Sequence, residues 1–108
     1  MPCTDSFVVN LLMRYFLLFY EVVDRFAEKR EPYRPKHLGL VDDAHKRGEL
    51  LLAGAYGDPP SGAALLFRAD SADEVRAFAE ADPYVKSGLV KSWSVQPWHV
   101  VVGEGSSR

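Results

Sequence analysis

The sequence predicts an α+β fold in which two helices cover one face of a four-stranded antiparallel sheet, in the chain order β-α-β-β-α-β. Three observations predict it: four apolar runs have the length of strands, two segments carry apolar residues at helical spacing, and a short loop of turn formers joins the second and third runs. A length of 108 residues suits one domain with one hydrophobic core.

The first strand is expected at residues 13–20, an aromatic and apolar run without a helical stripe. The first helix is expected to begin at Pro35, because proline is tolerated in the first turn of a helix. Leu38, Val41 and Ala44 recur at intervals of three residues and predict the side of this helix that faces the core.

A β-hairpin is expected in the middle of the chain. Residues 49–56 and 63–69 are apolar runs of strand length, and residues 57–62 between them are rich in glycine and proline. Two strands joined by so short a loop pair antiparallel. We therefore expect the second and third strands to be neighbours in the sheet.

A second helix and a last strand complete the chain. Ser71 and Glu74 have the spacing of a capping box at a helix start, and Pro83 is expected to end that helix. The last strand is expected within residues 86–102, where Pro97 indicates a sheet edge or a bulge. The whole order is that of a ferredoxin-like fold, also called a split βαβ arrangement.

The strands are apolar on both of their faces. A sheet with one face in water alternates polar and apolar residues along its strands, but residues 15–20, 50–52 and 63–67 are apolar in both phases. Two helices cover only one face, so a second sheet from another copy of the chain is expected to cover the other. The sequence therefore predicts a homodimer.

Composition argues against several kinds of partner. Thirteen Lys and Arg against fifteen Asp and Glu leave no basic surplus for nucleic acid. One cysteine forms no internal disulfide and no cysteine-based zinc site. The most apolar run, residues 7–20, is shorter than a membrane span and contains Asn10 and Arg14. We expect a cytoplasmic protein with no cofactor, no bound metal, and no nucleic-acid or membrane partner.

The chain resembles the YciI-like family of YCII-related domains across residues 13–102. The resemblance lies in the order and spacing of four segments, which are residues 34–38 (RPKHL), 48–54 (GELLLAG), 79–89 (AEADPYVKSGL) and 95–98 (VQPW). On this interpretation residues 1–12 are an N-terminal extension, and residues 103–108 are a flexible tail.

The resemblance implies a dimeric α+β barrel and a site built on His37 and Asp82. His37 would be the general base or acid, because imidazole titrates close to neutral pH. Asp82 would orient the ring and stabilise its protonated form. Enzymes that the chain resembles suggest cofactor-free proton transfer, with elimination or isomerisation, on a small and sometimes aromatic ring compound. The chain departs from the family pattern at Ala55, where proline is usual.

Three further residues are candidates for binding the substrate. Arg34 lies one helical turn before the histidine and could hold a negative charge, or it could form a surface salt bridge with Glu28 or Glu31. Tyr84 could donate a hydrogen bond from its phenol, or it could be an aromatic plug under the second helix. Gly54 could let the backbone approach a ligand, or it could mark a strand bulge.

Alternatives to catalysis remain open at this stage. Asp82 precedes a proline and could be an ordinary start of a turn. His37 could lie at a helix start without a role, and a metal pair of His37 with His45 lacks the usual four-residue spacing. The alternative function is a non-catalytic dimeric module that binds a small molecule or another protein.

Overall fold

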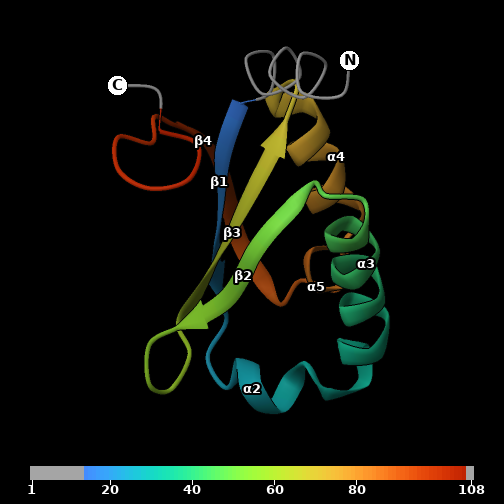
Figure 1. The fold of residues 1–108 in the computed structure, drawn as a ribbon. Helices are drawn as coiled ribbons and strands as arrows, with labels where there is room; N and C mark the ends of the chain where they lie inside the picture. Colours follow the sequence, from blue (N-terminus) through green and yellow to red (C-terminus); the bar gives the residue numbers. More distant parts are fainter. Residues whose placement is uncertain (1–13, 107–108) are drawn as a thin grey trace.

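The computed structural model describes residues 14–106, so the expected extension at residues 1–12 lies outside the described residues. The elements follow the order β1 (Arg14–Val22), α2 (Phe26–Lys29), η1 (Glu31–Tyr33), α3 (Arg34–Lys46), β2 (Leu50–Tyr56), β3 (Gly62–Ala69), α4 (Ala72–Ala81), α5 (Pro83–Lys86) and β4 (Val90–Trp98). The strands form one antiparallel sheet in the order β2-β3-β1-β4 (Figure 1). The expected α+β, ferredoxin-like fold is confirmed, with α2, η1 and α5 as short additions.

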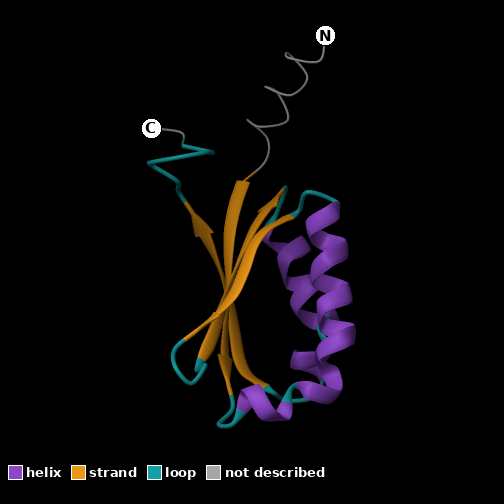
Figure 2. Cartoon of the chain, turned by 60° about the horizontal axis from the view of Figure 1, so that its bottom comes forward, coloured by secondary structure: helices purple, strands orange, loops and turns teal. Residues whose placement is uncertain are grey.

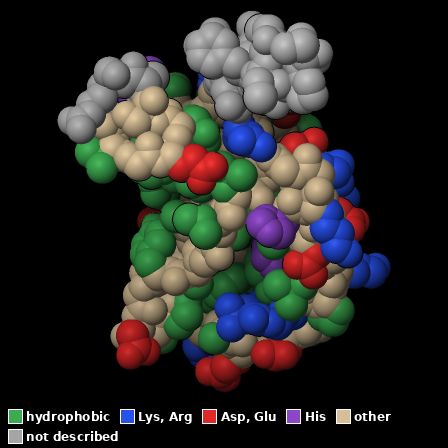
Figure 3. Space-filling model, in the orientation of Figure 1, with side chains coloured by type: hydrophobic (Ala, Val, Ile, Leu, Met, Phe, Trp, Pro, Cys, Tyr) green, Lys and Arg blue, Asp and Glu red, His purple; other side chains and the backbone are tan. Residues whose placement is uncertain are grey.

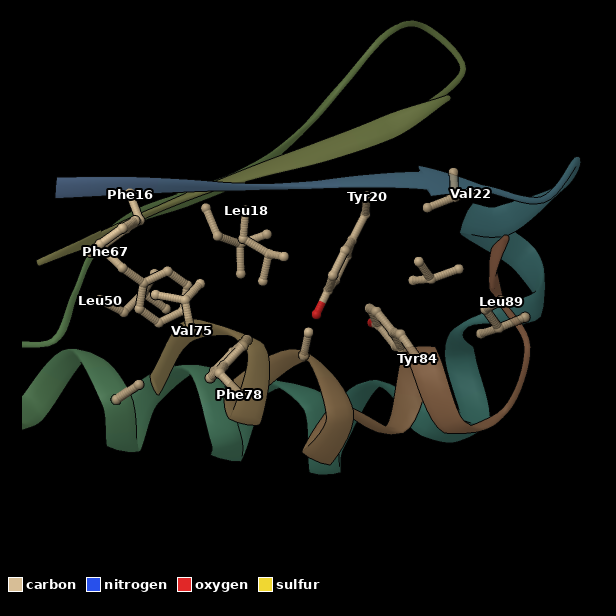
Figure 4. Packing of buried hydrophobic residues seen from close by; sticks show 14 of the residues in the cluster. Phe16, Leu18, Tyr20, Val22, Leu50, Phe67, Val75, Phe78, Tyr84 and Leu89 are labelled. Carbon is tan, nitrogen blue, oxygen red and sulfur yellow. The ribbon is translucent and has the colours of Figure 1, made fainter. Parts of the chain in front are cut away.

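The helices form one layer on a single side of the sheet (Figure 2). Phe16, Leu18, Tyr20 and Val22 point from β1 into the space between the two layers and are buried (Figure 4). Alternate residues of a strand point to the same face, so these four positions define the core side of the sheet. None of the helices in residues 14–106 combines the length and the apolar character needed to cross a membrane.

The inward side of α3 differs from the one expected. Leu38 is 40% exposed, whereas Ala44 is fully buried, and Leu40 and Val41 pack against the core. The positions that face inward are therefore 37, 40, 41 and 44, which still have helical spacing. His37 takes the first of them. The helix is turned so that a histidine, and not Leu38, faces the sheet.

The expected capping box at α4 is wrong. The side chain of Ser71 makes no cap hydrogen bond. The carboxylate of Glu74 instead accepts a hydrogen bond of 2.9 Å from the backbone N–H of Asp70, one residue before the cap position. Glu74 still satisfies a free backbone N–H at this turn, so the pattern located the helix start but not the bonding.

The last strand is shorter than expected. Residues 83–86 form α5, and the chain then turns at Gly88, whose φ of +83° lies in the left-handed region that glycine favours. The strand begins only at Val90 and ends at Trp98. It pairs with β1 alone and forms an edge of the sheet, which confirms the interpretation of Pro97 as an edge residue.

The other face of the sheet has no helix over it (Figure 2) and is apolar at its centre, while β4 places Ser94 and Gln96 on it. The register places Leu17 opposite Leu66 and Phe19 opposite Ala64, all on the face away from the core. Leu52 shares this face through its pairing with Leu66 and is 71% exposed. The apolar residues in both phases of the strands thus serve the core on one side and an uncovered surface on the other.

The tail expected at residues 103–108 is described as far as Ser106. The chain turns between Gly103 and Ser106, and the Ser106 hydroxyl donates a hydrogen bond of 2.9 Å to the carbonyl of Val101.

Candidate active site

A cavity of about 180 Å³ lies between α3 and the neighbouring strands β2 and β3. Arg34, His37, Gly54 and Tyr84 all line it, and Asp82 stands behind His37. The five residues expected from the sequence are therefore brought together. In the space-filling view, histidine and Lys or Arg side chains lie around a hollow that shows hydrophobic side chains in its depth (Figure 3).

His37 and Asp82 form a hydrogen-bonded pair although 45 residues separate them. The distance from His37 Nδ1 to Asp82 Oδ1 is 2.9 Å, and the side chains are 14% and 0% exposed. A carboxylate only accepts hydrogen bonds, so Nδ1 carries the hydrogen in this contact. This leaves Nε2 as the basic nitrogen of the neutral ring. The arrangement suits a base that is held in one tautomer.

Asp82 owes its position to the turn between α4 and α5. It caps α5, and its Oδ1 accepts a hydrogen bond of 3.0 Å from the backbone N–H of Tyr84. Pro83 occupies the first position of that short helix, where no backbone N–H is needed. The interpretation of Asp82 as a turn residue is therefore correct, and the same carboxylate also contacts His37.

Tyr20 is a third donor to Asp82, and the sequence analysis missed it. Its hydroxyl donates a hydrogen bond of 2.7 Å to Asp82 Oδ2, and Tyr20 is only 2% exposed. In Figure 4 its oxygen points from β1 toward the helix layer. Burial raises the pKa of Tyr20, and the negative charge of Asp82 raises that pKa further, so the phenol stays protonated and remains a donor.

Tyr84 is packed flat against His37. The ring centroids are 3.8 Å apart and the planes differ by 11°, while Phe26 meets the Tyr84 ring edge-on at 5.3 Å. Tyr84 is 3% exposed, so it is a buried part of the cavity wall. Burial raises the pKa of Tyr84, and the positive charges of Arg34 and Arg30 oppose that increase only in part.

Arg34 forms no ion pair within residues 14–106, so neither expected salt bridge is present. Glu28 instead pairs with Arg25 at 2.6 Å. Arg30 is a second guanidinium on the cavity wall that the sequence analysis missed. Its guanidinium carbon lies 5.4 Å from the centre of the Phe26 ring, a distance typical of a cation–π contact.

Gly54 is a regular strand residue, so the alternative that it marks a strand bulge does not hold. It pairs with Ala64, and the irregularity of β2 lies between Leu50 and Leu52. A Cβ added at Gly54 would meet no atom within 4 Å. Gly54 and Ala55 both line the cavity, so the position at which the chain departs from the pattern expected from the resemblance is part of the wall.

His45 has a local structural contact. Its Nδ1 lies 2.8 Å from the carbonyl of Leu50, and because a carbonyl only accepts, the ring donates this hydrogen bond. The bond ties the end of α3 to the start of β2. Residues 14–106 contain no group of three His, Cys, Asp or Glu side chains that could hold a metal ion.

Fold and site together define a small ferredoxin-like domain with a His–Asp pair on the wall of a cavity. A model of the YCII-related domain matches residues 13–99, so the chain belongs to this family. The chain is 35% identical over 83 residues to protein YciI of Escherichia coli O6:H1 strain CFT073, and the match covers 68% of this chain and 85% of the relative. Protein YciI of Shigella flexneri gives the same identity and coverage.

Two solved structures share the fold. The 5-chloro-2-hydroxyhydroquinone dehydrochlorinase of Burkholderia phenoliruptrix AC1100, solved with 2,5-dihydroxybenzoquinone, has a TM-score of 0.66 and 24% identity, covering 86% of this chain and 99% of that one. A conserved protein of Methanosarcina mazei Go1 has a TM-score of 0.52 and 14% identity, covering 85% of this chain and 96% of that one.

Proposed function

We propose that this protein is an enzyme that moves a proton on a small ring compound, with His37 as the base and Asp82 as the group that orients it. The observation that carries the proposal is the 2.9 Å contact between His37 Nδ1 and the buried Asp82, on the wall of a cavity. Both groups that the chemistry needs are side chains, so the proposed reaction uses no cofactor.

In the proposed reaction, His37 Nε2 accepts a proton from a carbon or a hydroxyl of the substrate. Asp82 stabilises the positive charge that the ring then carries, because it accepts the hydrogen bond from Nδ1. In an elimination, the electron pair left on the substrate expels a leaving group. In an isomerisation, it moves along the ring and takes the proton back at another atom. Arg34 holds the negative charge that develops.

The first substrates to test are hydroxylated rings with a halogen leaving group. The structure that shares this fold at a TM-score of 0.66 is named as a dehydrochlorinase of such a ring, which supports this choice without assigning the reaction. Chloride release and quinone absorbance should be followed with chlorinated hydroxyhydroquinones and their unchlorinated analogues. Chloride forms only in the elimination.

The deciding variants are His37→Gln and the matched control His45→Gln. A positioned general base contributes about 10²- to 10⁴-fold to a rate, so His37→Gln should lower kcat by that amount. His45 contacts Leu50 away from Asp82, and its variant should keep the wild-type rate. Equal rates in wild type and His37→Gln would remove His37 as the base. Ring compounds that bind the wild type without turnover would favour the non-catalytic module.

We also propose that two copies pack together through the uncovered sheet face. This face is apolar at Leu17, Phe19 and Leu66, and Leu52 is 71% exposed on it. Contiguous exposed apolar surface of this kind marks an interface in soluble proteins. Leu52→Glu should shift the sedimentation coefficient from dimer to monomer, while Ala77→Glu on the exposed side of α4 should leave it unchanged. A wild-type monomer at micromolar concentration would refute the dimer.

A further inference from the structure

Two polar atoms beside the cavity are buried and have no partner in good hydrogen-bond geometry within residues 14–106, although the Arg34 guanidinium lies near the Tyr84 hydroxyl. They are Nε of Arg30 and the phenolic oxygen of Tyr84. Buried polar groups in folded proteins are nearly always paired, so two orphaned groups beside one cavity need an explanation. Both residues line the cavity, which makes a ligand the natural partner.

The same part of the wall carries two guanidinium groups, and the nearest carboxylate, Asp82, is bonded to Tyr20, His37 and the backbone of Tyr84. Arg30 and Arg34 form no ion pair within the described residues, and Glu28 is already paired with Arg25 at 2.6 Å. Both guanidinium groups are close enough to act on the Tyr84 phenol. In the space-filling view, Lys and Arg side chains gather beside the hollow (Figure 3). An anion is therefore favoured there.

The size and the lining of the cavity indicate a ligand with a single ring. An apolar cavity of about 150 Å³ is large enough to bind benzene, and this cavity measures about 180 Å³. The cavity is therefore large enough for a single ring that carries small substituents. Phe26, Val41 and Leu65 supply apolar lining, while the stacked rings of His37 and Tyr84 form an aromatic part of the wall.

The number of hydrogen-bond donors on the cavity wall indicates which kind of anion the site would bind. Arg30, Arg34 and the Tyr84 hydroxyl offer hydrogen bonds from three side chains. A carboxylate presents two oxygens with about four acceptor positions, and guanidinium groups match its planar shape. A phenolate presents one oxygen, which all three donors would have to share. We propose that the substrate class of this site is a single-ring carboxylate, held by Arg30, Arg34 and Tyr84.

This inference rests on the proposed function for calling the ligand a substrate, but its test measures binding alone. Isothermal titration calorimetry of the full chain should compare benzoate with benzamide, which has the same shape without the charge. Wild-type protein should bind benzoate at least about 10-fold more tightly, because charge-assisted hydrogen bonds are the stronger ones. Equal affinity for the two compounds would overturn the proposal without any variant.

Two variants and one matched control test which residues bind benzoate. Arg30→Met keeps an apolar side chain against Phe26 and removes the guanidinium, and it should weaken benzoate binding about 10- to 100-fold and benzamide binding by a smaller factor. Tyr84→Phe keeps the ring stacked on His37 and should weaken benzoate binding about 10-fold. Arg47→Met is the matched control, since Arg47 is exposed and pairs with Glu49. Wild-type benzoate affinity in folded Arg30→Met would refute the assignment.

Two further experiments distinguish this inference from the proposed function. If 4-nitrophenolate bound more tightly than benzoate at alkaline pH, the site would prefer a single anionic oxygen. That result would overturn the proposal of a carboxylate ligand. His37→Gln should lose turnover and keep benzoate binding, since His37 is not among the three donors. Benzoate binding that depends on Arg30, in a protein without turnover of ring compounds, would refute the enzyme and leave the carboxylate site standing.

Discussion

Replacing Tyr20 by phenylalanine removes one oxygen from the centre of the site. That oxygen donates a hydrogen bond of 2.7 Å to Asp82, and the two residues are 2% and 0% exposed. Water cannot easily replace the lost donor, and hydrogen bonds to charged groups are worth about 1.5–3 kcal/mol. The phenyl ring keeps the remaining volume filled. We expect Tyr20→Phe to lower the free energy of unfolding by about 1.5–3 kcal/mol.

Urea unfolding followed by circular dichroism measures this loss, at one fixed protein concentration because a dimer would make stability concentration-dependent. Tyr33→Phe is the matched control, since Tyr33 is 40% exposed and its change should stay within about 0.5 kcal/mol. A double-mutant cycle with Asp82→Asn isolates the contact and should return a coupling of about 1 kcal/mol or more. A change in Tyr20→Phe no larger than the control's would refute the reasoning.

The remaining predictions concern alkaline pH, the core and the second histidine. Burial and Asp82 raise the pKa of Tyr20 in the folded protein, so the unfolded chain loses this proton first as pH rises above about 10, and the free energy of unfolding should fall by about 1.4 kcal/mol per pH unit. Urea unfolding across this range should show a shallower fall for Tyr20→Phe, and equal slopes would contradict the assignment. Phe78→Ala removes the aromatic contact with Phe67 at 5.0 Å and should cost about 3–5 kcal/mol in the same assay. His45→Ala should cost about 0.5–1.5 kcal/mol through the lost bond to Leu50 and leave turnover unchanged, and a loss of turnover in a stable variant would give His45 a role we do not propose.

The strands and helices were predictable because each depends on a pattern that is short in sequence. The apolar run at residues 13–20 and the turn formers at residues 57–62 predicted the first strand and the hairpin to within a few residues. The orientation of α3 was not predictable in the same way. Leu38 is more hydrophobic than His37, but the contact of His37 with Asp82 and Tyr84 turns the histidine inward. Contacts between segments distant in the sequence set the orientation of α3. The spacing of apolar residues within one helix carries no information about such contacts.

The pairing of His37 with Asp82 was predictable only because the resemblance named both residues. Spacing alone could not pair His37 with Asp82, and Tyr20 looked like one more apolar residue of a strand. The sequence did contain an indication of the role of Tyr20, because the hydroxyl of a buried tyrosine needs a hydrogen-bond partner. Arg30 lay in a charged run that is usually exposed to solvent, and only the fold shows that its Nε is buried beside the cavity.

The hydrogen bonds of Asp82 can form only when the fold is complete. Its carboxylate accepts hydrogen bonds from Tyr20 on β1, from His37 on α3 and from the backbone at the start of α5. Those partners are 62, 45 and 2 residues away, so the carboxylate is satisfied only when the sheet and both helical segments have packed. Replacing Asp82 would therefore disturb stability and, on the proposed function, the orientation of the base together. His37 is 14% exposed and stands at the edge of this network, so its substitution should disturb the fold less than that of Asp82 and is the better test of the proposed chemistry.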